Sequence, residues 1–208
     1  MESPYIISFY TENTLYELEA KILQESCETL KLPYYIKGVE NLGCWEINTA
    51  FKAGFIKRCL EHHKGPILWV DADGELLKKP TGFTGSIGIP IKPDLSQDHP
   101  LKISSSTLYF DYRKPAIEFL ESWAQKCEKA PYQCEKHHLR KTLFERNQWE
   151  GLFNLELHKT NKPLIRHYEA SRFLRKLVNK RLASIVNYDQ ITTDEWKSIR
   201  EEFYPSRS

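Results

Sequence analysis

The sequence predicts an α/β fold: a single domain with a central, mostly parallel mixed sheet flanked by helices. Short apolar segments alternate with longer segments of helical periodicity along the first 80 residues. The chain has 208 residues, 40% of them hydrophobic and 28% charged, which is enough to bury one substantial core. Strands that alternate with helices of this length are typical of βαβ units, whose parallel sheets are covered on both faces.

The first pair of elements is a strand over 5–10, YIISFY, and a helix over 15–32, LYELEAKILQESCETLKL. The strand is short, apolar and aromatic, and the helix repeats apolar residues at helical spacing. Thr11 or Asn13 is expected to cap the start of the helix, and Pro33 to close it.

The next elements are a strand over 34–39, YYIKGV, a helix over 45–63 and a strand over 67–70, ILWV. Lys64, Gly65 and Pro66 are expected to end the helix. The ILWV strand contains no polar position, which is the pattern of a central strand buried on both faces.

Composition limits the classes of function. The formal net charge of +2 favours no polyanionic partner, although Arg166–Arg181 is locally basic and could be a solvated helix face or an anion site. The five scattered cysteines indicate reduced thiols, because secreted disulfide frameworks usually hold an even number at regular spacing. No apolar run approaches the roughly 20 residues of a membrane span, and the first residues lack the features of a signal peptide. We therefore expect a soluble, cytoplasmic protein.

Two carboxylates follow the ILWV strand directly, Asp71 and Asp73. Ligands of open α/β sheets bind at the carboxyl ends of the strands, so both acids are expected at the binding edge. They face the same way if strand geometry persists through Ala72. Oxygen ligands of this kind suit Mg²⁺ or Mn²⁺, particularly beside substrate phosphates. The alternative is a helix cap with a turn aspartate, since Asp-Gly is also a common turn pair.

The segment ILWVDADGELLKKP, 67–80, resembles the strand, D-x-D motif and following proline of glycosyltransferases with the GT-A fold. The helix over 45–63 is similar to the Trp-x-x-Asn-x-x-x-Lys helix that precedes the motif in several such families. ISSSTLYFDYRKPAIEFLESW, 103–123, is similar to their following strand and helix, and PLIRHYEASR, 163–172, to their strand-terminal histidine. Together these segments extend the resemblance over about residues 5–176.

The resemblance implies a metal-dependent glycosyltransferase of the hexosyltransferase type, with Mn²⁺ or Mg²⁺ held by Asp71, Asp73 and His167. It implies that Trp45 walls the ligand, with a core position as the alternative, and that Lys52 or Arg172 pairs with phosphate, with a solvent-facing cation as the alternative. Glu135 is the candidate base if the enzyme inverts, although QCEKHHLRKTL, 133–143, lacks the Asp-Gln pair of related families. The full set of expected donor-binding residues is Thr11, Glu12, Trp45, Asn48, Lys52, Asp71, Ala72, Ser105 and Arg172.

The same resemblance divides the domain, 1–208, into a nucleotide-binding part over about 1–80, an acceptor-side part over about 81–176 and a helical tail over about 177–208. The expected partners are a nucleotide sugar, most simply a UDP-sugar, and a carbohydrate or glycoprotein acceptor in glycan biosynthesis. Neither nucleic acid nor a membrane span is expected, and the expected state is a monomer or weak dimer. The compact, anchor-free sequence resembles bacterial or large-virus members of the family.

Three other functions are compatible with parts of the sequence. VDADGELL also resembles the Asp-x-Asp-Gly strand end of haloacid-dehalogenase phosphohydrolases, in which Asp71 would be the nucleophile. Four side chains, those of Cys127, Cys134, His137 and His138, have the donor types of a zinc site without a known ligand spacing. An inactive module that binds sugar nucleotides is the third alternative.

Overall fold

A computed structural model of the chain describes residues 3–42, 44–93, 101–146, 149–155 and 163–168, together with 194, 197 and 198. Its centre is a six-stranded sheet with the order β2-β1-β3-β8-β5-β9. The strands are β1 (Tyr5–Thr11), β2 (Tyr34–Val39), β3 (Ile67–Val70), β5 (Ile87–Ile89), β8 (Thr107–Phe110) and β9 (Leu152–Asn154). The pairs β1–β2, β1–β3 and β5–β9 are parallel, whereas β8 runs antiparallel to β3 and β5. The predicted mostly parallel mixed sheet is confirmed.

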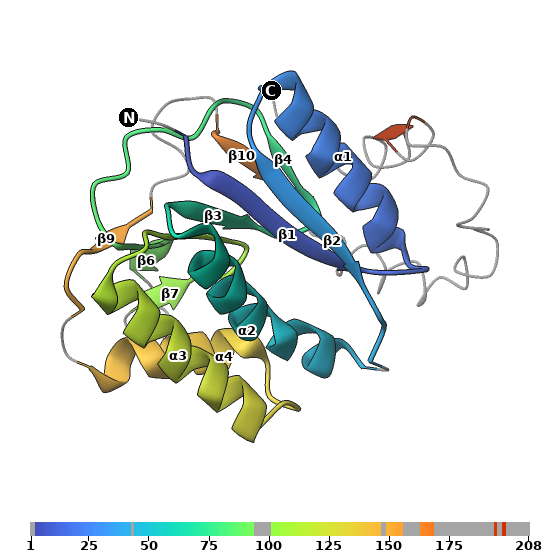
Figure 1. The fold of residues 1–208 in the computed structure, drawn as a ribbon. Coiled ribbons are helices and arrows are strands. Elements are labelled where there is room, and N and C mark those ends of the chain that lie inside the picture. The colour runs from blue at the N-terminus through green and yellow to red at the C-terminus, as the bar shows by residue number, and fades with distance from the viewer. Residues whose placement is uncertain are drawn as a thin grey trace.

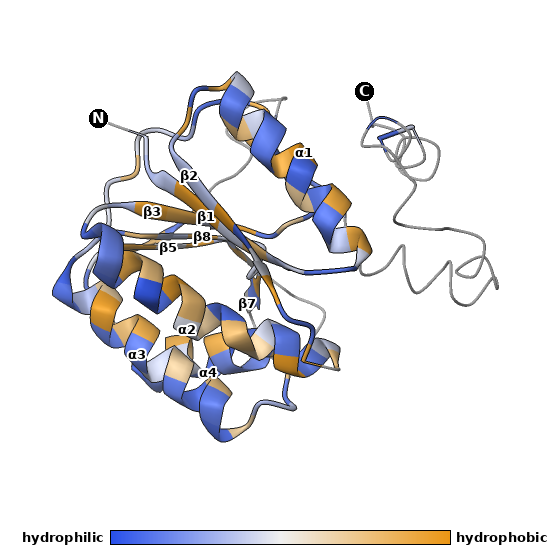
Figure 2. Ribbon diagram, turned by 45° about the vertical axis from the view of Figure 1, so that its right-hand side comes forward, coloured by the Kyte–Doolittle hydropathy of each residue, from blue (hydrophilic) through white to orange (hydrophobic). Residues whose placement is uncertain are grey.

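Helices cover both faces of this sheet (Figures 1 and 2). Helix α1 (Leu15–Thr29) lies on one face, and α2 (Trp45–His63), α3 (Lys114–Lys129) and α4 (Glu135–Glu145) lie together on the other. Two cores result, and strand alternation assigns successive residues of β3 to them. Leu68 packs in the core beneath α1, whereas Ile67 and Trp69 pack in the core beneath α2 and α3.

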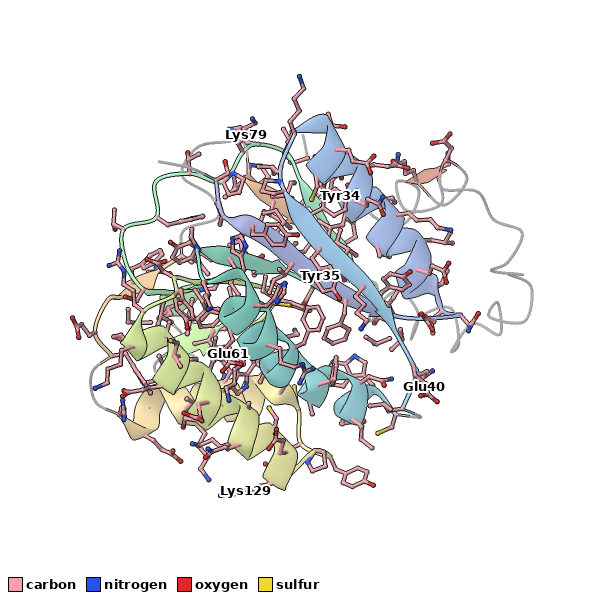
Figure 3. All side chains as sticks on the ribbon, in the orientation of Figure 1. Tyr34, Tyr35, Glu40, Glu61, Lys79 and Lys129 are labelled. Carbon is pink, nitrogen blue, oxygen red and sulfur yellow. The ribbon has the colours of Figure 1, made fainter. Side chains whose placement is uncertain are left out.

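The edge strand β2 shows the same alternation in two consecutive tyrosines (Figure 3). Tyr34 donates its hydroxyl hydrogen bond to Glu28 of α1 at 2.8 Å. The ring of Tyr35 stacks on Phe55 of α2, with the ring centroids 6.1 Å apart. Each tyrosine therefore ties β2 to the helix layer on its own side of the sheet.

Two small antiparallel sheets complete the fold. The first pairs β4 (Gly74–Leu76) with β10 (Ile165–His167), and the second pairs β6 (Ile91–Pro93) with β7 (Leu101–Ile103). In the β4–β10 pair, Gly74 lies opposite His167. This register brings His167 beside the segment that directly follows β3.

Most of the early elements have the bounds that the sequence predicts, and the helix over 45–63 is confirmed with Lys64 as its left-handed cap at φ 54°. The first helix begins at Leu15, as predicted, but its cap and its last residue differ from the prediction. Its N-cap is Thr14, whose hydroxyl accepts a hydrogen bond from the Tyr16 amide, rather than Thr11 or Asn13. It ends at Thr29, before 32, because Lys31 adopts a positive φ of 52° and no longer fits a helix.

Within the helical tail predicted over 177–208, the structure describes only Asp194, Lys197 and Ser198, which have helical backbone. The other residues of that range lie outside the described residues. Lys197 forms an ion pair with Glu25 of α1 at 2.6 Å. Within the described ranges, no helix combines the length and the apolar character needed to cross a bilayer.

Candidate functional site

A pocket of about 400 Å³ opens where β1 and β3 end. The first two turns of α2 line it, as do the loop before β8, the start of α4 and the end of β10. Side chains from segments more than 150 positions apart in the sequence therefore meet there. The lining residues are Phe9, Tyr10, Thr11, Tyr16, Trp45, Asn48, Thr49, Lys52, Trp69, Asp71, Ala72, Asp73, Ser104, Ser105, Ser106, Cys134, Glu135, Lys136 and His167.

The D-x-D segment forms a turn rather than an extension of β3. The strand ends at Val70, and the Gly74 amide donates to the carbonyl of Asp71 at 2.8 Å. The condition that strand geometry persists through Ala72 is therefore not met, because a turn leads directly into β4. Asp71 and Asp73 nevertheless both line the pocket.

Lys52 lies at the centre of the charged part of the site. Its ammonium donates to Asp71 Oδ1 at 2.8 Å and to Glu135 Oε1 at 3.1 Å, and it lies 3.4 Å from the Ser105 carbonyl oxygen. It also lies 5.2 Å from the centroid of the Trp69 ring, within the range of a cation–π contact. Because Lys52 is only 5% exposed, these partners replace the water that a surface lysine would have.

Each carboxylate that pairs with Lys52 has further partners. Asp71 Oδ1 accepts a second hydrogen bond from the Trp69 indole at 2.8 Å. Glu135 Oε1 accepts one from the Ser105 hydroxyl at 2.7 Å, and Oε2 accepts from Cys134 Sγ at 3.1 Å and from the Lys136 amide. Glu135 is therefore almost fully committed to partners within the protein.

The ionisation of this cluster follows from burial and pairing. Burial alone would lower the pKa of Lys52, but attraction to Asp71 and Glu135 outweighs it and raises that pKa above the ordinary value. Burial would also raise the pKa of Glu135, yet Lys52 and the Ser105 hydrogen bond hold it below its usual range. Burial raises the pKa of Asp71 against the attraction of Lys52, and repulsion from Asp73 adds to the rise. A second cation would relieve that repulsion.

His167 approaches the motif through the β4–β10 register. Its Nε2 atom lies 2.8 Å from the Thr107 hydroxyl, whereas Nδ1 is buried without a hydrogen-bond partner in the described part of the chain. Nδ1 lies 3.9 Å from Asp73 Oδ1. A Cβ atom on Gly74 would lie 2.5 Å from Val70 Cγ1 and 3.3 Å from His167 Cε1, so only glycine allows this close approach.

These donors suit a divalent cation. When Nε2 carries the proton and donates to Thr107, the lone pair of His167 Nδ1 faces the carboxylate of Asp73, an arrangement typical of metal-binding histidines. Among the residues that the structure describes, no three His, Cys, Asp or Glu side chains already form a metal-ligand cluster. Asp71 Oδ1 instead accepts hydrogen bonds from Lys52 and Trp69.

The residues predicted on α2 and β1 differ in their roles. Trp45 lines the pocket and is 43% exposed, so it walls the site rather than filling the core. Asn48 lines the pocket and also holds the preceding loop, accepting from the Leu42 amide at 2.8 Å and donating to Asn41 at 2.9 Å. Thr11 reaches the pocket at the end of β1, where its hydroxyl lies 3.0 Å from that of Thr14.

Of the remaining expected donor-binding residues, one lies away from the described pocket and another lies outside the described residues. Glu12 is exposed, is absent from the pocket lining, and has its side chain close to Gly38 of β2. Arg172 lies outside the described residues. Ala72 and Ser105 do line the pocket, at the D-x-D turn and in the loop before β8.

No protein-family model matches the sequence, and no curated protein matches it. The fold does match solved structures. One is the crystal structure of a glycosyltransferase involved in the glycosylation of the major capsid of PBCV-1, with a TM-score of 0.63 and 15% sequence identity. The match covers 86% of this chain and 100% of that chain. The chain has the fold of a glycosyltransferase.

Five of the lining residues that sequence reasoning missed are Tyr10, Tyr16, Thr49, Cys134 and Lys136. One of them had a signal: Thr49 lies on the same helical face as Trp45, Asn48 and Lys52, at intervals of three and four residues. The others belong to loops or to element ends, where no periodic pattern exists. The zinc alternative gains no support, since the His138 ring contacts the Ala130 carbonyl and burial raises the pKa of Cys127 to about 12.

Proposed function

We propose that the protein transfers a sugar from a nucleotide diphosphate donor, a UDP-sugar in the simplest case, to a carbohydrate or glycoprotein acceptor, and that it uses Mn²⁺ or Mg²⁺. The fold supports glycosyl transfer. The observation that carries the finer proposal is the convergence of Asp71, Asp73 and His167 on one pocket that also holds a buried lysine. Acidic oxygens and an imidazole nitrogen suit a cation, and a cation with a lysine suits a diphosphate.

The residues of this chain would share the work of binding and charge neutralisation. Asp71, Asp73 and His167 would hold the cation, which when bound would neutralise charge on the departing nucleoside diphosphate. Trp45, exposed at the pocket wall, offers a flat apolar surface to the donor, and Thr11 offers a hydroxyl at the end of β1. The Ser104 and Ser106 hydroxyls, 2.8 Å apart, supply polar contacts on the wall before β8.

The role of Glu135 as a base stays a prediction. A base must offer a carboxylate oxygen to the acceptor hydroxyl, and it works best with a pKa near the working pH. Glu135 instead accepts hydrogen bonds at both oxygens, and Lys52 holds its pKa below the usual range, although burial acts in the opposite direction. These contacts favour a role in holding Lys52.

A panel of nucleotide sugars tests the proposal. Each is incubated with the protein in MnCl₂ or in chelator, and released nucleoside diphosphate is measured. We expect release from at least one donor in the Mn²⁺ arm only, and a loss of at least 100-fold in Asp73→Asn. The control is Lys57→Met, a change on α2 at a lysine whose ion pairs in the described part of the chain, with Glu61 and Glu121, are partly exposed.

The alternative functions are tested in parallel, with a simple phosphate ester and with added acceptors. Phosphate release from a simple phosphate ester, without cleavage of any nucleotide sugar, would replace the proposal with a phosphohydrolase in which Asp71 is the nucleophile. Metal-dependent binding of a donor that is never cleaved, with any acceptor offered, would indicate an inactive binding module.

A further inference from the structure

Lys52 occupies an unusual position for a lysine beside an expected metal site. Its ammonium lies 2.8 Å from Asp71 Oδ1, and Asp71 is one of the carboxylates that the cation needs. A lysine and a divalent metal ion at the same carboxylate repel each other strongly at this range. The cation therefore binds Asp71 more strongly when the ammonium moves away from it.

The structure supplies the second position for that ammonium. Glu135 Oε1 already accepts from the Lys52 ammonium at 3.1 Å, and Glu135 itself is 3% exposed. Its carboxylate is fixed by the Ser105 hydroxyl and by the start of α4. The Ser105 carbonyl, 3.4 Å from Nζ, offers a further acceptor beside it. An ammonium released by Asp71 therefore keeps a buried counter-charge.

We propose that Lys52 is a built-in counter-ion of Asp71, which a divalent cation displaces, and that Glu135 and Ser105 are positioning residues that retain the displaced ammonium. This inference rests on the metal site of the proposed function and adds a mechanism for loading it. In the metal-free protein Lys52 neutralises Asp71, whose ionised form is disfavoured by burial and by repulsion from Asp73. When metal binds, the same ammonium stays beside the pocket, where it can face the donor's phosphates.

The exchange has a measurable consequence. If the ammonium competes with the metal at Asp71, removing it must tighten metal binding in the absence of any nucleotide. The single change Lys52→Met would leave the buried Glu135 without a counter-ion and also alter the charge of the site. The double variant Lys52→Met/Glu135→Gln removes one positive and one negative charge, so the net charge of the pocket is unchanged.

The experiment titrates MnCl₂ into nucleotide-free protein and measures bound Mn²⁺ by the loss of its aqueous electron paramagnetic resonance signal. We expect the double variant to bind Mn²⁺ about 10-fold more tightly than wild type. The matched control is Lys57→Met/Glu121→Gln, which removes an equivalent ion pair between α2 and α3 at the surface, where the two groups are 3.6 Å apart. Its affinity for Mn²⁺ should equal that of wild type.

A third variant identifies the carboxylate. Adding Asp71→Asn to the double variant should abolish the gain, because no carboxylate would remain where the ammonium had competed. Equal or weaker Mn²⁺ affinity in the double variant overturns the counter-ion inference. That result leaves glycosyl transfer standing if wild type still cleaves a nucleotide sugar. Lack of donor cleavage, with the 10-fold gain present, overturns the proposed function alone.

Discussion

The change Lys52→Met should destabilise the protein strongly, because it removes the ammonium and keeps a side chain of similar length. Lys52 is 5% exposed and pairs with Asp71 at 2.8 Å and Glu135 at 3.1 Å. Removing one partner of a buried ion pair costs about 3–5 kcal/mol, since the other charge stays buried and unpaired. Glu135, whose side chain is 4% exposed, should account for most of this cost, whereas the Asp71 side chain is 30% exposed and can be solvated.

The pH dependence of this loss has a definite sign. In wild type, Lys52 lowers the pKa of both carboxylates. Without Lys52, burial leaves the pKa values of Asp71 and Glu135 higher than in wild type. The folded variant therefore binds more protons than folded wild type as the pH falls. The unfolded chains titrate alike, so the destabilisation should be smaller at pH 5.5 than at pH 7.5.

Urea unfolding at pH 7.5 and at pH 5.5, followed by far-ultraviolet circular dichroism, measures both quantities. A loss of about 3–5 kcal/mol corresponds to a melting temperature lower by about 6–20 °C in a chain of this size. Lys57→Met, which breaks only partly exposed pairs at 3.6 and 3.7 Å, should cost under about 1 kcal/mol at either pH. A Lys52→Met loss that matches this control, or that is the same at both pH values, would refute the counter-ion reasoning.

Three further predictions concern the metal-binding side of the pocket. Asp71→Asn and Asp73→Asn should each lower donor cleavage at least 100-fold while the circular dichroism of the fold is retained; wild-type turnover at limiting Mn²⁺ would exclude either residue as a ligand. His167→Ala should weaken Mn²⁺-dependent binding of a nucleoside diphosphate by about 10- to 100-fold in calorimetric titration, and equal losses in chelator would instead indicate a packing role. Gly74→Ala should cost about 1–3 kcal/mol because its Cβ would collide with the β3–β4 turn. The helical control Gly54→Ala, which meets only a flexible arginine end, should be neutral or stabilising, and a neutral Gly74→Ala would contradict the close packing of the β3–β4 turn.

The sequence was most informative where one physical pattern dominates. The apolar run of β3 predicted a strand buried on both faces, and the bounds of α2 followed from its periodicity and from the Gly-Pro that follows Lys64. The resemblance added His167, whose place beside Asp73 depends on the pairing of β10 with β4. No local pattern could predict that pairing, since it joins segments about 90 residues apart in the sequence.

The sequence failed where neighbouring residues compete for the same role. Thr11, Asn13 and Thr14 are all suitable caps, and backbone geometry decided for Thr14, which is extended at φ −136° and ψ 166°. At the D-x-D segment, the alternation rule assumed that the strand continued. The hydrogen bond from the Gly74 amide to Asp71 shows that it does not.

Lys52, Asp71 and Glu135 form a group of ion pairs in the pocket that could not be predicted from the sequence. Taken one at a time in the sequence, Lys52 and Glu135 were each open to two interpretations. Lys52 could have been a solvent-facing cation, and Glu135 had the acidic place of a base without the expected Asp-Gln pair. The residues are 83 positions apart, and their contact depends on α4 packing against α2. Once that contact exists, a buried lysine between two carboxylates cannot be an ordinary surface charge, because its desolvation must be offset by both partners. The same contact explains the acidic side chain at position 135 as the buried counter-ion of Lys52, without requiring Glu135 to take a proton from an acceptor.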